Sequence, residues 1–483
     1  MNSAAWPGGR IFTGADGFPA AESGARTDRR EEMTNDTIAA IATPPGTGGV
    51  AVIRISGPDA EAVLKKVFPR ASFTHGQMVY GSVRRNGELL DTVMAVLFYA
   101  PKSYTGEQTA ELHCHGSAVG VRRVLGYVLE CGARPAEPGE FTRRAFLNGK
   151  MDLSQAEAVC DFISASSQAG AKASLGQLAG KLKERVLSYQ DRLTDALARV
   201  EAVVEYPEEN LEEEVSEELL PVLKELQKGL LGLADTYRAG RIAKEGLRVA
   251  IAGKPNVGKS SLLNALAGMD RAIVADVPGT TRDTIEQGVD IGGIMIYLTD
   301  TAGIRSTSDE IEAQGVKRSE NAINESKLAI FMLDGSGKIT EEDHLAMRTL
   351  KKSKADLLVV LNKLDARERL SEKDVKKEFG VLPLRISAKT GAGIDELKQK
   401  LLKYAEQDKT AGELLITNER HVFALRRAAG EIGEAMEAME QGIDMDCVTI
   451  DLNAAWASLG EITGKTVSEE IIDRIFTKFC LGK

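Results

Sequence analysis

Residues Gly253 to Ser261 read GKPNVGKSS, a Gly-x-x-x-x-Gly-Lys-Ser motif of the kind that binds phosphate. It follows an apolar run, Leu247 to Ala252, that predicts a strand, and it opens a segment of helical character. Backbone N–H groups of such a turn point at phosphate oxygens, Lys259 reaches the β- and γ-phosphates, and Ser260 is a ligand of Mg²⁺. The motif predicts nucleotide binding and by itself fits ATP and GTP about equally.

Three further motifs decide the nucleotide. Residues Asp300 to Gly303 read DTAG, where the aspartate holds a water on Mg²⁺ and the glycine N–H senses a γ-phosphate. Residues Asn362 to Asp365 read NKLD, and Asp365 can accept from N1–H and the exocyclic amine of guanine, whereas adenine has an acceptor at N1. Residues Ser387 to Lys389 close the base pocket. Each motif follows a predicted strand, so the set predicts a GTP site in the crevice of an open α/β sheet.

The segment that should sense GTP, Gly279 to Asp283, reads GTTRD and has no strand character. We expect a switch loop there, with Thr281 as the second protein ligand of Mg²⁺. Ile304 stands where many GTPases have a glutamine that orients the attacking water, and isoleucine cannot do this. Two groups are candidates to replace the missing glutamine. Asn256 could bind a monovalent cation, and a carboxylate among Asp309, Glu310 and Glu312 could orient the water. An ordinary exposed charged loop is the alternative interpretation of each.

Composition limits the other possibilities. The 483 residues, 43% hydrophobic and 27% charged, predict about three globular domains. No run of about 18 apolar residues occurs, so we expect no membrane span. A net charge of −10 argues against broad electrostatic wrapping of nucleic acid. The five cysteines are odd in number, lack C-x-x-C spacing and favour the cytoplasm; they are Cys114, Cys131, Cys160, Cys447 and Cys480.

The chain divides into segments of different pattern. Residues 1–32 are polar and glycine-rich, which predicts a disordered extension and suggests Met33 as the start of translation. Residues 33–150 predict a mixed α/β domain, with strands at Val50 to Ile55 and Thr92 to Tyr99 and a helix at Val119 to Cys131.

Helical patterns fill residues 151–246 and 409–483 and flank an alternation of strands and helices at 247–408. Apolar steps of 3, 4 and 4 from Leu175 to Val204 predict one nearly straight helix of roughly 45 Å, stopped by Pro207. An acidic loop, Glu208 to Glu214, and a second helix, Leu223 to Tyr237, should follow. The simplest topology inserts an α/β domain into one helical domain.

From Met33 to Lys483 the chain resembles the MnmE (TrmE) family of tRNA modification GTPases, of the TrmE-Era-EngA-YihA-Septin-like class. Besides the GTPase motifs, the resemblance rests on four stretches: Asp36 to Gly57, Glu111 to Gly116, Pro138 to Val159, and the terminal FCLGK from Phe479 to Lys483. It implies an N-terminal domain that binds formyl-tetrahydrofolate and holds a homodimer together, a helical domain, and an inserted Ras-like P-loop GTPase domain.

The resemblance also implies a reaction. With the FAD-dependent partner MnmG (GidA), in a heterotetramer, the family adds a (carboxymethyl)aminomethyl group at C5 of the wobble uridine of certain tRNAs, using the folate one-carbon unit. GTP hydrolysis with K⁺ drives dimerisation of the GTPase domains. Two rival hypotheses stay open: a non-catalytic GTP-dependent switch of the ribosome-assembly type, which would predict a basic RNA-binding appendage, and a folate-binding scaffold gated by GTP.

Residue roles follow from the same resemblance. It implies that Lys259 and Glu312 act in hydrolysis, Glu312 by orienting water. It implies K⁺ ligation by Asn256, Ala275, Val277 and Thr280, although Ala275 stands where some relatives have Thr. The residues expected to bind GTP are Asn256, Val257, Gly258, Lys259, Ser260, Ser261, Ala275, Asp276, Val277, Pro278, Gly279, Thr280, Thr281, Asp300, Thr301, Ala302, Gly303, Asn362, Lys363, Asp365, Ser387, Ala388 and Lys389.

The resemblance places folate at Arg54, Glu111, Lys150 and Lys483, and it makes Cys480 a proposed catalytic residue beside them. A buried small side chain is the alternative role of Cys480. His113 and His115 alternate along one predicted strand, where strand-end structure is a simpler interpretation than metal binding.

Overall fold

The computed structural model describes residues 36–70, 72–206, 208, 211–269, 286–300, 323–406 and 414–483. The predicted N-terminal extension and Met33 lie outside these residues. Two compact units are present, one formed by Met1–Met151 with Arg474–Lys483 and the other by Asp152–Asp473. In the described part of the chain, every helix is too short or too polar to cross a membrane.

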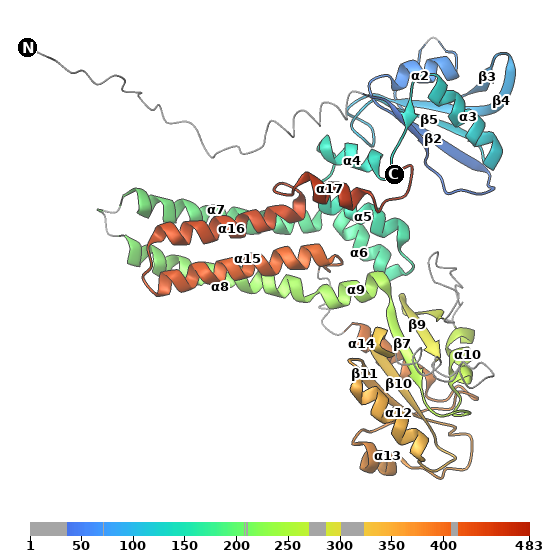
Figure 1. Ribbon diagram of the computed structural model, residues 1–483, viewed down its shortest axis with the longest axis vertical. Helices are drawn as coiled ribbons and strands as arrows, with labels where there is room; N and C mark the ends of the chain where they lie inside the picture. The colour runs from blue at the N-terminus through green and yellow to red at the C-terminus, as the bar shows by residue number, and fades with distance from the viewer. Residues whose placement is uncertain are drawn as a thin grey trace, which may run out of the picture. The chain divides into compact units, whose positions relative to one another are not determined.

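The first unit is the expected mixed α/β domain (Figure 1). Its sheet has the strand order β3-β4-β5-β2-β1-β6, and α2 and α3 pack on the sheet through an apolar core. The elements are β1 (Ile38–Ile41), β2 (Val50–Ser56), α2 (Ala60–Val67), β3 (Val79–Arg85), β4 (Glu88–Phe98), β5 (Thr109–His115), α3 (Ala118–Glu130), β6 (Arg134–Pro135) and α4 (Glu140–Leu147). The two predicted strands and the predicted helix are confirmed to within a few residues.

The last ten residues, Arg474–Lys483, belong to this unit, although the helical pattern predicted that residues 409–483 are all part of the helical domain. After α17 (Glu469–Phe476), the ring of Phe476 lies 6.3 Å from that of Phe146. Gly139 has a left-handed φ of 72°, and a Cβ there would lie 2.5 Å from the carbonyl oxygen of Phe476. Aromatic packing against α4 therefore fixes the last residues to the first unit.

The predicted single helix from Leu175 is wrong, because Gly180 adopts a left-handed φ of 87° and breaks it. The chain forms α6 (Gln168–Leu178) and α7 (Lys181–Glu205), and Leu175 is exposed. The acidic loop is also partly wrong. Glu212–Glu214 form the first turn of α8 (Glu212–Asp235), where the partial positive charge of a helix N-terminus favours carboxylates.

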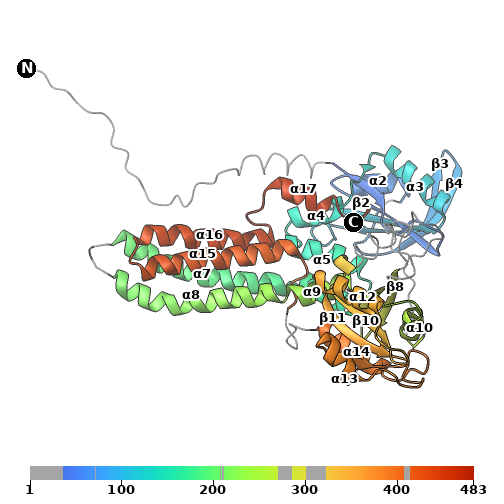
Figure 2. The same cartoon turned by 60° about the horizontal axis from the view of Figure 1, so that its bottom comes forward.

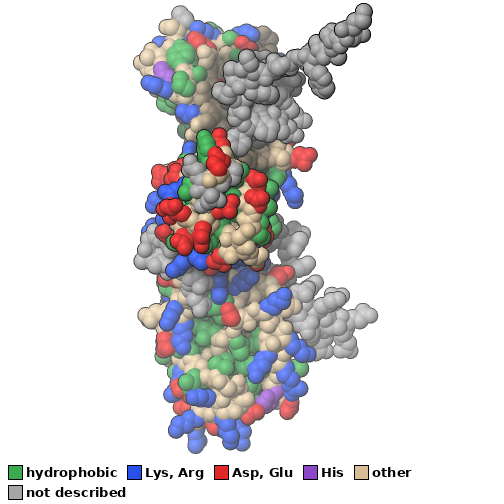
Figure 3. All heavy atoms as spheres, turned by 90° about the vertical axis from the view of Figure 1, so that its left-hand side faces the viewer, with side chains coloured by type: hydrophobic (Ala, Val, Ile, Leu, Met, Phe, Trp, Pro, Cys, Tyr) green, Lys and Arg blue, Asp and Glu red, His purple; other side chains and the backbone are tan. Residues whose placement is uncertain are grey.

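Four long helices, α7, α8, α15 (Glu419–Glu440) and α16 (Met445–Thr463), run side by side and bury their apolar faces in one core (Figures 1 and 2). Acidic side chains gather at the end of this bundle where α7 and α8 meet (Figure 3). Two helices complete the helical part: α5 (Leu153–Ser164) and α9 (Tyr237–Glu245).

The inserted α/β domain has the strand order β12-β11-β10-β7-β9-β8. Its elements are β7 (Leu247–Ala252), α10 (Lys259–Met269), β8 (Glu286–Ile291), β9 (Ile294–Asp300), β10 (Leu328–Asp334), α12 (Glu341–Lys352), β11 (Asp356–Asn362), α13 (Glu372–Phe379), β12 (Leu384–Arg385) and α14 (Ile394–Ala405). Helices α10 and α14 cover one face of the sheet, and α12 and α13 cover the other. The strand predicted at Leu247 to Ala252 is confirmed as β7, and the predicted alternation of strands and helices follows it.

Strand β8 was not predicted from the sequence. It pairs antiparallel with β9 at the sheet edge, and its segment EQGVDI offers only two buried apolar side chains, Val289 and Ile291. The remaining pairs are parallel. The strands that follow β7 in the chain lie on both sides of it, β9 on one side and β10 on the other. The carboxyl end of β7 is therefore a topological switch point, where open α/β sheets bind ligands.

Candidate functional site

The phosphate loop connects β7 to α10 at this switch point. Asn256 and Gly258 adopt left-handed backbone conformations, with φ of 62° and 103°. Val257 between them is fully buried, so one side chain anchors the turn to the core. The amine of Lys259 donates to the carbonyl oxygens of Gly253 at 2.7 Å and of Lys254 at 3.0 Å. The loop thus has the shape that its motif predicts, with the lysine held across it.

Asn362, the first residue of the NKLD motif, joins the phosphate loop to the base loops. Its Nδ2 donates to the carbonyl oxygen of Val257 at 2.7 Å, and its Oδ1 accepts from the backbone N–H of Ala388 at 3.0 Å. Asn362 is 2% exposed. A Cβ at Gly258 would lie 2.3 Å from Asn362 Nδ2, which explains the glycine. Motifs more than 100 residues apart therefore meet through one buried amide.

The base loops hold their charged groups in defined positions. The hydroxyl of Ser387 donates to Asp365 Oδ1 at 2.5 Å, and this hydrogen bond, with Lys389 nearby, lowers the pKa of Asp365. Asp365 is thus ionised at neutral pH and acts only as an acceptor. Lys363 has a left-handed φ of 72°, and its amine lies 2.7 Å from Asp334 Oδ2 at the end of β10.

Two expected groups of the Mg²⁺ site face each other, since Ser260 Oγ lies 3.4 Å from Asp300 Oδ2. A hydroxyl and a carboxylate are hard oxygen donors, which suit Mg²⁺. Ser261 is exposed beside them. Other predicted positions lie outside the described residues: Ala275, Asp276, Val277, Pro278, Gly279, Thr280, Thr281, Thr301, Ala302, Gly303, Ile304, Asp309, Glu310 and Glu312.

In the first unit, Arg54 on β2 lies opposite Glu111 on β5, and its Nε is 2.9 Å from Glu111 Oε1. The Arg54 guanidinium lies over the rings of Tyr104 and Phe141, with its central carbon 5.0 and 5.7 Å from their centroids. One guanidinium nitrogen, Nη1, is buried without a hydrogen-bond partner among the described residues. An unsatisfied buried donor costs free energy, so a ligand with an acceptor oxygen or nitrogen fits here.

The C-terminal residue approaches the same pair. The pKa of Lys483 is lowered by burial and by the charge of Arg54. Glu111 and Cys480 raise this pKa, but by less, so the net shift is downward. Cys480 is exposed, contrary to its interpretation as a buried small side chain. The amine of Lys150 donates to the carbonyl oxygen of Pro101 at 3.0 Å, in the loop that carries Tyr104. Arg54, Glu111 and Lys483 therefore form one cluster, and Lys150 lies on the neighbouring loop.

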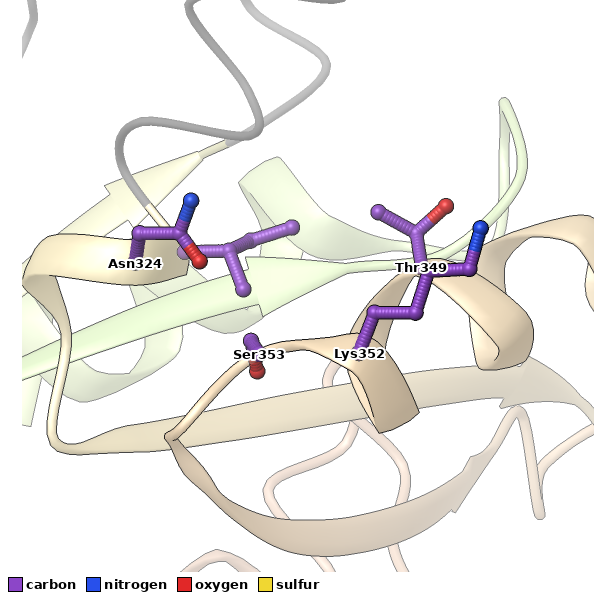
Figure 4. A pocket seen from close by; sticks show the side chains of 5 residues that line it. Asn324, Thr349, Lys352 and Ser353 are labelled. Atoms are coloured by element: carbon purple, nitrogen blue, oxygen red, sulfur yellow. The ribbon is translucent and has the colours of Figure 1, made fainter.

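The two histidines have ordinary partners. His113 Nε2 lies 3.3 Å from Glu111 Oε2, and His115 Nδ1 lies 2.7 Å from Asp91 Oδ1. Within the described ranges, no group of three or more His, Cys, Asp or Glu side chains could hold a metal ion. A separate pocket beside the end of α12 is lined by Ile323, Asn324, Thr349, Lys352 and Ser353 (Figure 4). It includes none of the predicted site residues.

Comparison with known proteins agrees with this arrangement. The profile described as MnmE helical domain matches residues 153–480, and that described as GTP-binding protein TrmE N-terminus matches residues 37–150. The chain belongs to the MnmE family of tRNA modification GTPases. It is 44% identical over 471 residues to the relative from Heliobacterium modesticaldum and 42% identical over 467 residues to that from Desulforamulus reducens. Each alignment covers 93% of this chain and 100% of the relative.

Among solved structures, the G domain of the T. maritima FeoB iron transporter is 28% identical over 33% of this chain and 98% of that one. Era in complex with MgGDPNP and ribosomal RNA is 29% identical, over 38% of this chain and 66% of that one. With a TM-score of 0.27 in both cases, these likenesses add nothing to the sheet order described above.

Some site residues were missed from the sequence. Asp334, which pairs with Lys363, ends an apolar run at the same sheet edge as the motifs, so its position could have identified it. Tyr104 and Phe141 around Arg54 have no comparable signal, because they come from a loop and a helix with unrelated spacing.

Proposed function

We propose that this chain is a Mg²⁺-dependent GTP hydrolase that takes part in tRNA modification. Membership of the MnmE family supports the class of reaction. The observation that carries the proposal is the pair of hydrogen bonds made by Asn362, one donated to Val257 and one accepted from Ala388, because they join the phosphate loop to the loop that we propose binds guanine. Asp365→Asn should exchange guanine for xanthine preference in a hydrolysis assay; unchanged GTP use would refute the assignment of the base pocket.

The chain's own residues divide the work. Lys259, which now donates to two loop carbonyls, would transfer its donors to β- and γ-phosphate oxygens. Ser260 and Thr281 would be the protein ligands of Mg²⁺, with Asp300 holding one of its waters, and the ion would neutralise charge on the transferring phosphoryl group. The ionised Asp365 would accept two hydrogen bonds from guanine.

We further propose that hydrolysis depends on K⁺. Asn256 is exposed within the phosphate loop, so its amide oxygen is available to a cation. Ala275, Val277 and Thr280 are proposed as the further ligands. Glu312 is proposed to orient the attacking water. Phosphate release measured in K⁺ and in Na⁺ at equal ionic strength tests the cation. Equal rates would refute it, and Glu312→Gln should lower kcat without weakening GTP binding.

The cluster of Arg54, Glu111 and Lys483 is proposed to bind formyl-tetrahydrofolate, with Lys150 at its margin. The unpartnered Arg54 nitrogen supports a ligand with ring acceptors, and Glu111 offers a carboxylate to the donor groups of a pterin. Bound folate would supply a one-carbon unit. Calorimetric titration with formyl-tetrahydrofolate should show binding that Glu111→Gln weakens at least tenfold; equal affinity would refute the site.

The finer proposal joins these two sites. Acting as a homodimer in the cytoplasm and in a heterotetramer with MnmG, which brings FAD, the protein would help to add a (carboxymethyl)aminomethyl group to the wobble uridine of tRNA. Cys480, exposed beside Lys483, is proposed as a catalytic residue. Cys480→Ser should abolish modification while GTP hydrolysis continues. Full modification by this variant would remove Cys480 from the chemistry and favour the scaffold hypothesis.

The rival switch hypothesis makes a different prediction. A non-catalytic switch of the ribosome-assembly type would associate with ribosomal subunits in a GTP-dependent manner and would leave tRNA nucleosides unchanged when deleted. Sucrose-gradient sedimentation together with nucleoside analysis of tRNA separates the two.

A further inference from the structure

The phosphate loop carries a second lysine, Lys254, whose amine contacts α12 and the loop before it. Lys254 Nζ lies 2.8 Å from Asp343 Oδ2 and donates to the carbonyl oxygen of Lys338 at 3.3 Å. The Lys254 side chain is 16% exposed and that of Asp343 is 0% exposed. This is an ion pair of low exposure, unlike the solvated surface pairs that contribute little to stability.

Asp343 lies in the first turn of α12, and its carboxylate has two tasks. Oδ2 also accepts from the backbone N–H of Thr340 at 3.0 Å, which is its part of the capping box of the helix, and from the Thr340 hydroxyl at 2.9 Å. The other oxygen, Oδ1, is buried without a hydrogen-bond partner among the described residues. The capping box alone does not need a lysine, so the Lys254 contact is an additional link from α12 to the phosphate loop.

The connection between β10 and α12 touches both halves of the nucleotide site. At its beginning, Asp334 pairs with Lys363 of the NKLD motif, and the N–H of Gly335 donates to the carbonyl oxygen of Asn362 at 2.8 Å. At its end, Lys338 and Asp343 hold Lys254. This connection contains none of the GTPase motifs, yet it links the phosphate loop to the base loop.

We propose that Lys254 and Asp343 are positioning residues for GTP, which hold the phosphate loop in its binding shape. Lys259 donates to the carbonyl oxygens of Gly253 and Lys254, and as a residue of the motif it also serves the phosphates. Lys254 and Asp343 have no such second role, so their ion pair is a tether of this end of the loop that does not depend on the nucleotide. The proposal rests on GTP binding at this loop and adds two residues to it.

Removing one partner leaves a buried charge unpaired, whereas removing both does not. Stopped-flow release of a fluorescent GDP analogue from the full-length protein should be about tenfold faster in Lys254→Met and in Asp343→Asn. The double variant should also release about tenfold faster, instead of a hundredfold, because the two substitutions break one interaction. Lys254→Arg should restore release to within about threefold, since a guanidinium has donors for both Asp343 oxygens.

Thr340→Val is the matched control. It removes the hydroxyl that donates to Asp343 Oδ2 and takes part in the capping box, keeps the side-chain shape, and leaves Lys254 and Asp343 paired. It should lower the thermal stability without changing GDP release. In steady-state hydrolysis, Lys254→Met should raise KM about tenfold with kcat within threefold of the wild type, because the loop must then be ordered by the nucleotide.

Two results would overturn the proposal: release at the wild-type rate from folded Lys254→Met, or acceleration by Thr340→Val equal to that by Asp343→Asn. Should Lys254→Met fail to fold, Asp343→Asn and Lys254→Arg make the same test. Failure of the wild-type protein to bind the GDP analogue would instead refute the GTP site itself.

Discussion

Replacement of Asn362 by Ala perturbs the GTP site where its loops meet. The substitution removes the donor to the Val257 carbonyl oxygen and the acceptor of the Ala388 N–H, two buried hydrogen bonds of 2.7 and 3.0 Å. Each backbone group left unpaired costs about 1–3 kcal/mol, so the assembled site loses at least about 2 kcal/mol. GTP affinity should fall at least about thirtyfold, because each 1.4 kcal/mol is a factor of about ten.

Titration of the full-length protein with a fluorescent GTP analogue measures this loss. Thermal unfolding of the same variant serves as a control that the inserted domain is folded, and Asn324→Ala, at the separate pocket, should bind like the wild type. An Asn362→Ala dissociation constant within threefold of the wild type would refute the reasoning, since it would mean that the phosphate and base loops are positioned independently.

Three further substitutions test other parts of the structure. Gly258→Ala, at a φ of 103° and with its Cβ 2.3 Å from Asn362 Nδ2, should weaken GTP binding by about tenfold or more in the same titration; wild-type affinity would contradict the fit. Burial raises the pKa of Glu157, but its interactions with His421 and Arg420 are stronger and lower the pKa from 4.5 to about 2. Ionised Glu157 therefore stabilises the folded protein above pH 4.5, and this stabilisation is lost as the pH falls towards 2. The loss amounts to about 3 kcal/mol, and urea unfolding followed by circular dichroism should show a shallower acid dependence for Glu157→Gln; parallel curves would contradict it. Phe476→Ala should release the chain end from α4 and speed its digestion by carboxypeptidase several-fold, whereas an unchanged rate would show that the aromatic contacts do not hold it.

Motif spacing and runs of apolar residues were sufficient to predict the α/β fold of the inserted domain. The segment from Leu328 to Leu333 is a continuous apolar run, as a strand buried on both faces requires, and Leu247 to Ala252 departs from this pattern only at the exposed Arg248; the structure has strands at both places. The edge strand β8 could not be predicted from an apolar run, because only two alternate side chains, Val289 and Ile291, are apolar and buried. Helix α7 begins later than predicted because the apolar period continues across Gly180, and periodicity carries no information about a left-handed residue.

The part of the GTP site that depends on local sequence, the phosphate loop, could be predicted. Turn geometry at Asn256 and Gly258 is encoded within a few residues of the motif. The contacts of Lys254 with Asp343 and of Arg54 with Tyr104 arise from residues far apart in the chain, so only the folded arrangement reveals them. Arg54 and Glu111 became candidates through family resemblance, and their pairing across β2 and β5 gives them a physical reason to act together.

If GTP hydrolysis by this chain serves tRNA modification, the nucleosides of tRNA must respond to a defect in the GTP site. Cells that lack the protein would be complemented with the wild type or with Asp365→Asn, and wobble-uridine nucleosides would be quantified by mass spectrometry. We expect the (carboxymethyl)aminomethyl nucleoside to return with the wild type and to stay absent with Asp365→Asn. The same nucleoside content in the deletion strain and in both complemented strains would contradict it.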